Sequence, residues 1–116
     1  RLADAYLIYA EAVARGGSGD VTLALSLVNQ LRTRAGANKL TTLTLDNLLN
    51  ERGRELYWEG HRRTDLIRFG KFTSGYNWAW KGGEKAGKDV EAYRSLYPLS
   101  GTDLVANPTL KQNEGY

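Results

Sequence analysis

The 116-residue chain contains no cysteine and no methionine, and it has only two prolines and one histidine. Without cysteine it can form no disulfide, no thiol nucleophile and no zinc site of the thiolate type. Because a translation start carries methionine, and because the first residues already follow a helical pattern, we expect the chain to be a fragment of a longer protein. It has no signal-peptide pattern and no apolar run near the roughly 18 residues that cross a membrane.

The charges of the chain are almost balanced, with 16 Lys and Arg against 13 Asp and Glu and a formal net charge of +3. The contents of 41% hydrophobic and 25% charged residues are those of a globular domain, which excludes wholesale disorder. Nucleic-acid binding requires basic side chains gathered on one face. We expect no nucleic-acid partner, because acids are interleaved with the bases.

Two helices are predicted in the first third of the chain. Apolar residues recur at three- and four-residue spacings over residues 2–15, until the glycines of segment 16–19 stop the pattern. Asp20 is a suitable N-cap for a second helix, and Gly36 is a suitable C-terminal stop. Since the break between them is so short, we expect an antiparallel pair of the size of one tetratricopeptide-type repeat.

A third helix is predicted after a polar connection at residues 37–44, capped by Thr44 and ended by Gly60. Its apolar stripe consists of Leu45, Leu48, Leu49, Leu56 and Tyr57. Gly53 interrupts the stripe at a cost of about 1 kcal/mol relative to alanine, so either a neighbouring helix approaches there or the helix is weakened. A short helical segment is expected from residue 64 or 65 to about residue 69.

The remaining chain has little helical pattern. Residues 73–89 contain four glycines, and loops of this length are usually functional or mobile. The end of the chain allows one helical turn near residues 102–106, and its aromatic content predicts that it packs back on the helices. The predicted fold is all-α, with tetratricopeptide-like antiparallel helix pairs, a long irregular loop and an irregular C-terminal tail. The predicted segments are the helix pair 1–36, the helices of 44–72, the loop 73–95 and the packed tail 96–116.

The charged residues of the third segment are spaced as helical ion pairs. Acids and arginines alternate at three- and four-residue intervals, which neutralises them on a helix surface. We therefore interpret this cluster as an ion-pair network at a helix junction and not as a phosphate-binding surface. The expected pairs are Glu51 with Arg54, Glu59 with Arg62 and Arg63, and Asp65 with Arg68.

No catalytic residue, metal site or cofactor is predicted. His61 is the only histidine and has no second metal ligand or nucleophile beside it in the sequence. Glu55 and Glu59 lie one helical turn apart, whereas the two carboxylates of a glycosidase face each other across the substrate.

The aromatic residues of the loop allow two interpretations. Trp78 and Trp80 alternate, so that in an extended segment both rings would lie on the same side, beside Tyr76. Such rings could stack on the apolar face of a sugar, while Asn77 and Lys81 bond to its hydroxyl groups. In the second interpretation the rings only anchor the loop to the helical core.

Four segments, in order, resemble the C-terminal region of the SusD/RagB family. The first two are LADAYLIYAEA at residues 2–12 and ALSLVNQLRTRAG at residues 24–36. The third, LNERGRELYWEGHRRTDLIRFGKF at residues 49–72, is similar to the most distinctive stretch of that family. The fourth comprises LYPL at residues 96–99 and NPTLKQNEGY at residues 107–116.

The resemblance implies a surface-exposed outer-membrane lipoprotein of Bacteroidetes-type bacteria that binds glycans or other nutrients. Such proteins pass their ligand to a TonB-dependent (SusC-like) transporter, have a tetratricopeptide-like helical fold and are not enzymes. The resemblance places the lipid-anchoring cysteine, and most ligand-binding residues, upstream of this fragment. The fragment would then be mainly scaffold or docking surface, with Trp58 and Phe69 buried.

Two other classes of function remain open at this point. The first is a free-standing tetratricopeptide-like module that grips peptides between its helices. The second, weaker alternative is a carbohydrate-active enzyme. A lipoprotein signal upstream and an adjacent transporter gene would favour the nutrient-binding family over both.

Overall fold

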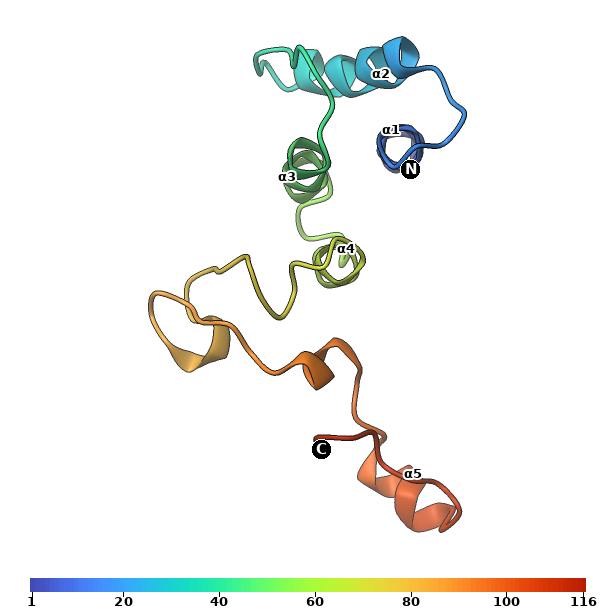
Figure 1. Ribbon diagram of the computed structural model, residues 1–116, viewed down its shortest axis with the longest axis vertical. Coiled ribbons are helices and arrows are strands. Elements are labelled where there is room, and N and C mark those ends of the chain that lie inside the picture. The colour runs from blue at the N-terminus through green and yellow to red at the C-terminus, as the bar shows by residue number, and fades with distance from the viewer. The chain divides into compact units, whose positions relative to one another are not determined.

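The computed structural model describes all residues from 1 to 116 and contains helices but no β-strand (Figure 1). This confirms the prediction of an all-α chain. The residues form two compact units, Arg1–Phe69 and Gly70–Tyr116. No helix combines the length and the hydropathy that a bilayer crossing requires.

The first unit contains helices α1 (Leu2–Ala14), α2 (Val21–Arg34), α3 (Leu45–Glu55) and α4 (Arg62–Arg68). Helix α1 packs against both α2 and α3, and α3 also packs against α4. In Figure 1, α1, α3 and α4 are all seen end-on while α2 lies across the view, so α2 crosses the common direction of the other three helices.

The turn between α1 and α2 is held by side chains as well as by its glycines. Asp20 caps α2 as predicted, because its Oδ1 accepts hydrogen bonds from the amides of Thr22 (2.7 Å) and Leu23 (3.3 Å). The Tyr9 hydroxyl accepts a hydrogen bond from the Asp20 amide at 2.9 Å. A Cβ at Gly19 would lie only 2.4 Å from Val13 Cγ2, so this turn requires glycine for close approach.

The core of the first unit lies between the first three helices. Its members alternate between leucine or valine and alanine, which lets the helix axes approach closely. The completely buried members are Leu7 and Ala10 of α1, Ala24 and Val28 of α2, and Leu48 of α3. The core is therefore small, and further stabilisation has to come from polar contacts.

Helix α3 ends at Glu55, before the predicted end at Gly60. The backbone turns at Trp58, which has a positive φ of 64°, and this conformation cannot continue a right-handed helix. Leu56 stays buried, but the side chains of Tyr57 and Trp58 are 74% and 89% exposed. The predicted burial of Trp58 is therefore wrong, because the early turn removes this residue from the helical stripe; Phe69 is half-buried.

Gly53 of α3 faces the side chain of Arg62, the first residue of the neighbouring helix α4. A Cβ at this position would lie 2.8 Å from Arg62 Nη1, which donates a hydrogen bond to the carbonyl oxygen of Leu49 at 2.7 Å. The missing side chain thus lets the Arg62 guanidinium cross α3 and reach its backbone.

Gly53→Ala is expected to have different effects on stability in two backgrounds. In Arg62→Ala the extra methyl group meets no guanidinium, so it should stabilise the helix by about 1 kcal/mol through helix propensity. With Arg62 present, displacement of the guanidinium should cancel this gain. Urea unfolding of the four variants in a double-mutant cycle measures the coupling, and equal effects of Gly53→Ala in both backgrounds would contradict it.

The second unit contains two 3₁₀ turns, η1 (Lys81–Gly83) and η2 (Ala92–Ser95), and the six-residue helix α5 (Gly101–Ala106). Its only buried residue is Lys81. The end of the chain is tied to residues of its own unit: Gln112 exchanges two hydrogen bonds with the backbone of Leu99 (2.8 and 3.0 Å), and the Tyr116 ring meets Tyr93 edge-on at 4.9 Å. Packing of this tail on the helices of the first unit stays a prediction.

Candidate functional site

The most deeply buried cationic side chain of the first unit is that of Arg52 of α3, which is 3% exposed. Its Nη1 lies 2.9 Å from Asp4 Oδ1 of α1, and its Nε lies 2.9 Å from Asp65 Oδ2 of α4. These distances are those of ion pairs, although none of the four atoms forms an aligned hydrogen bond. Arg52 thus joins three helices mainly by electrostatic attraction.

The network continues from Asp65 along one side of α1. Asp65 Oδ1 pairs with Arg68 at 2.7 Å, and Arg68 makes two hydrogen bonds to the Glu11 carboxylate, at 2.8 and 2.9 Å. Glu11 also accepts a hydrogen bond of 2.9 Å from Arg15. Three carboxylates therefore alternate with three guanidinium groups, and no charge in the series lacks a neighbour of opposite sign.

The ionisation of Glu11 reflects this arrangement. Burial raises its pKa, but hydrogen bonds from Arg68 and Arg15 outweigh burial and bring the pKa below the ordinary value of 4.5. The hydrogen bond to Glu11 raises the pKa of Arg68 above its usual range, against the opposing effect of burial. Both groups stay charged near neutrality, which suits a structural network and not proton transfer.

A second group of carboxylates joins the ends of α1, α2 and α3. Glu51 lies 2.6 Å from Arg32 and 2.6 Å from Arg54, and Glu55 lies 2.5 Å from Arg34 and 2.9 Å from Arg1, the residue before α1. Most of these contacts connect residues distant in sequence, so helical spacing alone does not reveal them.

The structure brings together two of the expected pairs, Glu51 with Arg54 and Asp65 with Arg68. Glu59 lies against Arg1, with Arg1 Nε 2.9 Å from Glu59 Oε1, and its predicted pairing with Arg62 and Arg63 stays a prediction. Arg62 reaches the Leu49 carbonyl as described, and Arg63 is half-buried.

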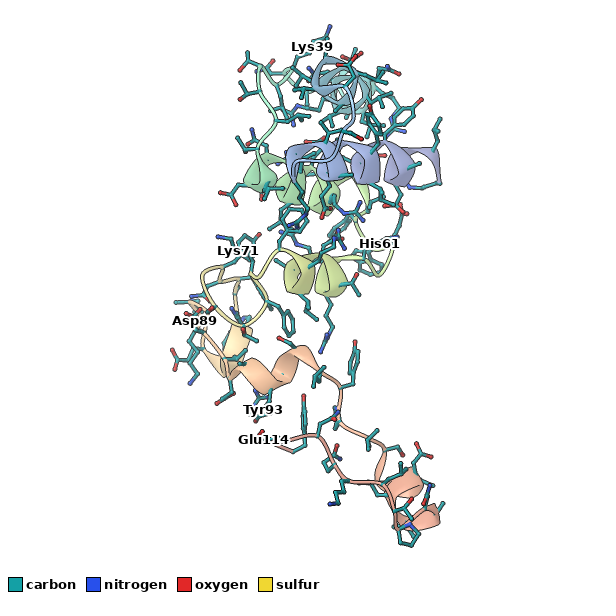
Figure 2. The ribbon with its side chains drawn as sticks, turned by 45° about the vertical axis from the view of Figure 1, so that its right-hand side comes forward. Lys39, His61, Lys71, Asp89, Tyr93 and Glu114 are labelled. Carbon is teal, nitrogen blue, oxygen red and sulfur yellow. The ribbon has the colours of Figure 1, made fainter.

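His61 lies at the start of α4 (Figure 2) and lines a shallow depression together with members of the Arg52 network. The other lining side chains are mainly arginines and the carboxylates paired with them. No group of three or more His, Asp or Glu residues in the chain is arranged to hold a metal ion. The depression therefore presents the outer face of the ion network.

The loop of the second unit is organised around Lys81, whose side chain is 2% exposed. Its Nζ donates a hydrogen bond to the Tyr76 carbonyl oxygen at 2.8 Å and lies 3.7 Å from Asp89 Oδ1. The same atom is 5.0 Å from the centroid of the Trp78 ring. Lys81, expected to reach sugar hydroxyl groups, thus points inward and ties the loop together.

The two tryptophans of the loop do not occupy an extended segment. Trp80 has a positive φ of 69°, so the alternation that would place both rings on one side of a strand is absent. The Trp78 ring lies 6.1 Å from the Phe72 ring and 6.3 Å from the Tyr76 ring, whereas Trp80 is 67% exposed. Asn77 is exposed. Trp80 is consequently the aromatic side chain of this loop that is most available to a ligand.

We expect Arg52→Met to destabilise the chain by about 3 kcal/mol, because it leaves the buried Asp65 carboxylate with only part of its compensation. Arg54→Met is a matched control, since Arg54 is exposed and its partner Glu51 keeps Arg32. The control should cost less than about 1 kcal/mol. Urea unfolding followed by far-ultraviolet circular dichroism measures both, and equal losses would refute a special role of Arg52.

The lowered pKa of Glu11 predicts a pH dependence of stability. A carboxyl group whose pKa is lower in the folded state stabilises above its unfolded pKa, and this contribution is lost as the pH falls through the folded pKa. Glu11→Gln should therefore be less stable than the parent chain at pH 7, with the difference shrinking below about pH 4.5.

Urea unfolding at several pH values measures this convergence. Glu91→Gln is the control, because the pKa of Glu91 is also lowered by a hydrogen bond, from Arg94, but this pair is exposed and screened by solvent. If the difference between Glu11→Gln and the parent chain does not depend on pH, Glu11 is not charged in the network as described.

Comparison with known proteins places these features in a family. The model of the SusD family matches residues 1–116, which is the whole chain. The chain is 48% identical to the starch-binding protein SusD of Bacteroides thetaiotaomicron over 118 residues, covering 100% of this chain and 21% of that protein.

Solved structures agree with this result. A SusD superfamily protein from Bacteroides vulgatus superposes with a TM-score of 0.76 at 33% identity, covering 100% of this chain and 27% of the other. A laminarin-binding SusD-like protein superposes with a TM-score of 0.73 at 31% identity, covering 100% of this chain and 22% of the other. The chain spans about a fifth of the length of the relatives that it matches by sequence. From the family match over its full length and from the helical fold that goes with it, the chain belongs to the SusD family.

Proposed function

We propose that this chain is part of a glycan- or nutrient-binding protein that works in an outer-membrane uptake complex with a TonB-dependent transporter. The observation that carries the proposal is the 48% identity, over the whole chain, to a starch-binding protein. A second relative in structure is a laminarin-binding protein, so glucose polymers with different linkages occur among the ligands of similar proteins. In this proposal the protein is held at the cell surface by an N-terminal lipid anchor that lies outside this chain.

The part played by residues 1–69 is mainly that of a scaffold or docking surface. Their buried charged side chains are all engaged in ion pairs that connect the four helices, and the deepest of them, Arg52 and Asp65, are 3% and 1% exposed. Such groups fix the relative positions of helices and leave no buried side chain aimed at a substrate. This arrangement supports binding without catalysis.

The residues proposed to contact a ligand lie in the second unit, in the loop that contains Tyr76, Asn77, Trp78, Trp80 and Lys81. Of these, Trp80 and Asn77 are exposed, Trp78 is exposed to 38% and packs beside other rings of the loop, and Lys81 is engaged within the loop. The first two would touch the ligand directly, and the other three would hold them in place.

The proposal predicts that the complete gene product binds glucan oligosaccharides and does not cleave them. Isothermal titration calorimetry with maltoheptaose and laminariheptaose tests binding, and chromatography of the sugars after long incubation tests cleavage. Co-purification with the product of an adjacent transporter gene tests the partnership. Absence of glycan binding together with absence of a transporter partner would favour a free-standing peptide-binding module, and release of shorter sugars would favour an enzyme.

The scaffold role of the ion network in residues 1–69 can be tested separately in the complete gene product. Arg52→Met should lower the melting temperature but leave glycan affinity unchanged at temperatures where the protein is folded. Arg54→Met should change neither quantity appreciably. A loss of affinity in folded Arg52→Met would show that the ion network belongs to the binding site.

A further inference from the structure

The second unit contains a surface depression of about 620 Å³, which is within the range of roughly 300–1,000 Å³ usual for small-ligand sites. Trp80 forms part of its wall, and Asp89 lies on the same loop (Figure 2). The other residues that matter for its chemistry are Trp78, Lys88, Glu91 and Arg94. Its wall is thus partly aromatic and partly charged.

The aromatic part is presented by a constrained turn. Trp80 has φ 69° and ψ 4°, a conformation that is a true outlier for a bulky residue and persists only where neighbouring structure enforces it. Its carbonyl oxygen accepts a hydrogen bond from the Gly83 amide at 3.0 Å, and the Lys81 amide donates to the Trp78 carbonyl oxygen at 3.1 Å. The buried Lys81 side chain holds the same turn from inside. The exposed ring of Trp80 therefore sits on a backbone that is fixed before any ligand arrives.

The polar part of the wall carries both signs of charge. Lys88 pairs with Glu84 at 2.9 Å, and Arg94 pairs with Glu91 at 2.6 Å, while the Asp89 side chain is 56% exposed. Because both acidic and basic side chains line the depression, it has no strong preference for an anion or a cation. Paired carboxylates and cationic groups of this kind can accept hydrogen bonds from, and donate them to, neutral hydroxyl groups.

We propose that this depression binds one pyranose unit of a neutral oligosaccharide, with the sugar face stacked on Trp80 and its hydroxyl groups directed to the charged rim. A pyranose has an apolar face of C–H groups and a polar edge, which matches an exposed indole ring beside mixed charges. The inference rests on the proposed glycan-binding function and names the residue and the depression that would hold the sugar.

The test compares Trp80→Ala with Trp58→Ala in this chain. Trp58 is a matched control, because it is also exposed and also has a positive φ, but it belongs to the other unit. Titration with maltoheptaose and laminariheptaose, followed by tryptophan fluorescence and calorimetry, should show binding in about the millimolar range for a site of this size. Trp80→Ala should weaken it about tenfold, since tryptophan anchors carry much of the affinity of such contacts.

Three further measurements sharpen the test. Trp80→Phe keeps an aromatic face and should retain binding within about threefold. The affinity for a neutral sugar should not change between low salt and about 0.5 M salt, because screening over this range weakens ionic contacts only. Far-ultraviolet circular dichroism should be the same for the parent chain and for Trp78→Ala and Trp80→Ala. Unchanged affinity in Trp80→Ala, equal losses in Trp80→Ala and Trp58→Ala, strong salt dependence, or loss of helix content in Trp80→Ala would each overturn the inference.

The complete gene product separates this inference from the proposed function. If it binds a glucan equally well with and without Trp80→Ala, the depression is not a sugar site but the proposed function stands. If it binds no glycan and has no transporter partner, the proposed function fails as well. If both the chain and the gene product lose affinity with Trp80→Ala, the inference is supported in both.

Discussion

The first unit depends on the buried guanidinium of Arg52, held between carboxylates of α1 and α4. A charge at 3% exposure loses most of its hydration, so it is tolerated only if carboxylates replace the water around it. That requirement couples α1, α3 and α4, because a shift of α1 or α4 relative to α3 would leave a buried charge without compensation. The small apolar core brings α1, α2 and α3 together, and the Arg52 contacts specify how α4 is placed against them.

The charged stretch around residues 51–68 therefore has a structural explanation. Glu11 extends the series by binding Arg68 through two hydrogen bonds, and Gly53 lets Arg62 reach the backbone of α3. Residues that resemble acid–base or phosphate-binding groups in the sequence are thus engaged with each other. A domain held in this way is a rigid support.

The second unit is stabilised differently. With Lys81 as its only buried residue, it relies on hydrogen bonds, ring contacts and turns that place glycine, and once tryptophan, at positive φ. The inward-facing ammonium group of Lys81 takes the place that a hydrophobic core takes elsewhere, because it satisfies the Tyr76 carbonyl oxygen and lies over the Trp78 ring. The same turn leaves Trp80 exposed and fixed, so the stability of the loop and the ligand contact that we propose for Trp80 have a common origin.

Local sequence patterns were sufficient for the helices and their caps. Apolar spacing predicted α1, α2 and α3, and Asp20 and Thr44 cap their helices by hydrogen bonds that depend only on residues two or three positions away. The pairs Glu51–Arg54 and Asp65–Arg68 follow from the same short-range geometry. Tertiary structure alone decided the partners of Arg52, the exposure of Trp58 and the inward direction of Lys81. Each of these depends on a turn or on a contact between distant segments, and neither helical periodicity nor residue type contains that information.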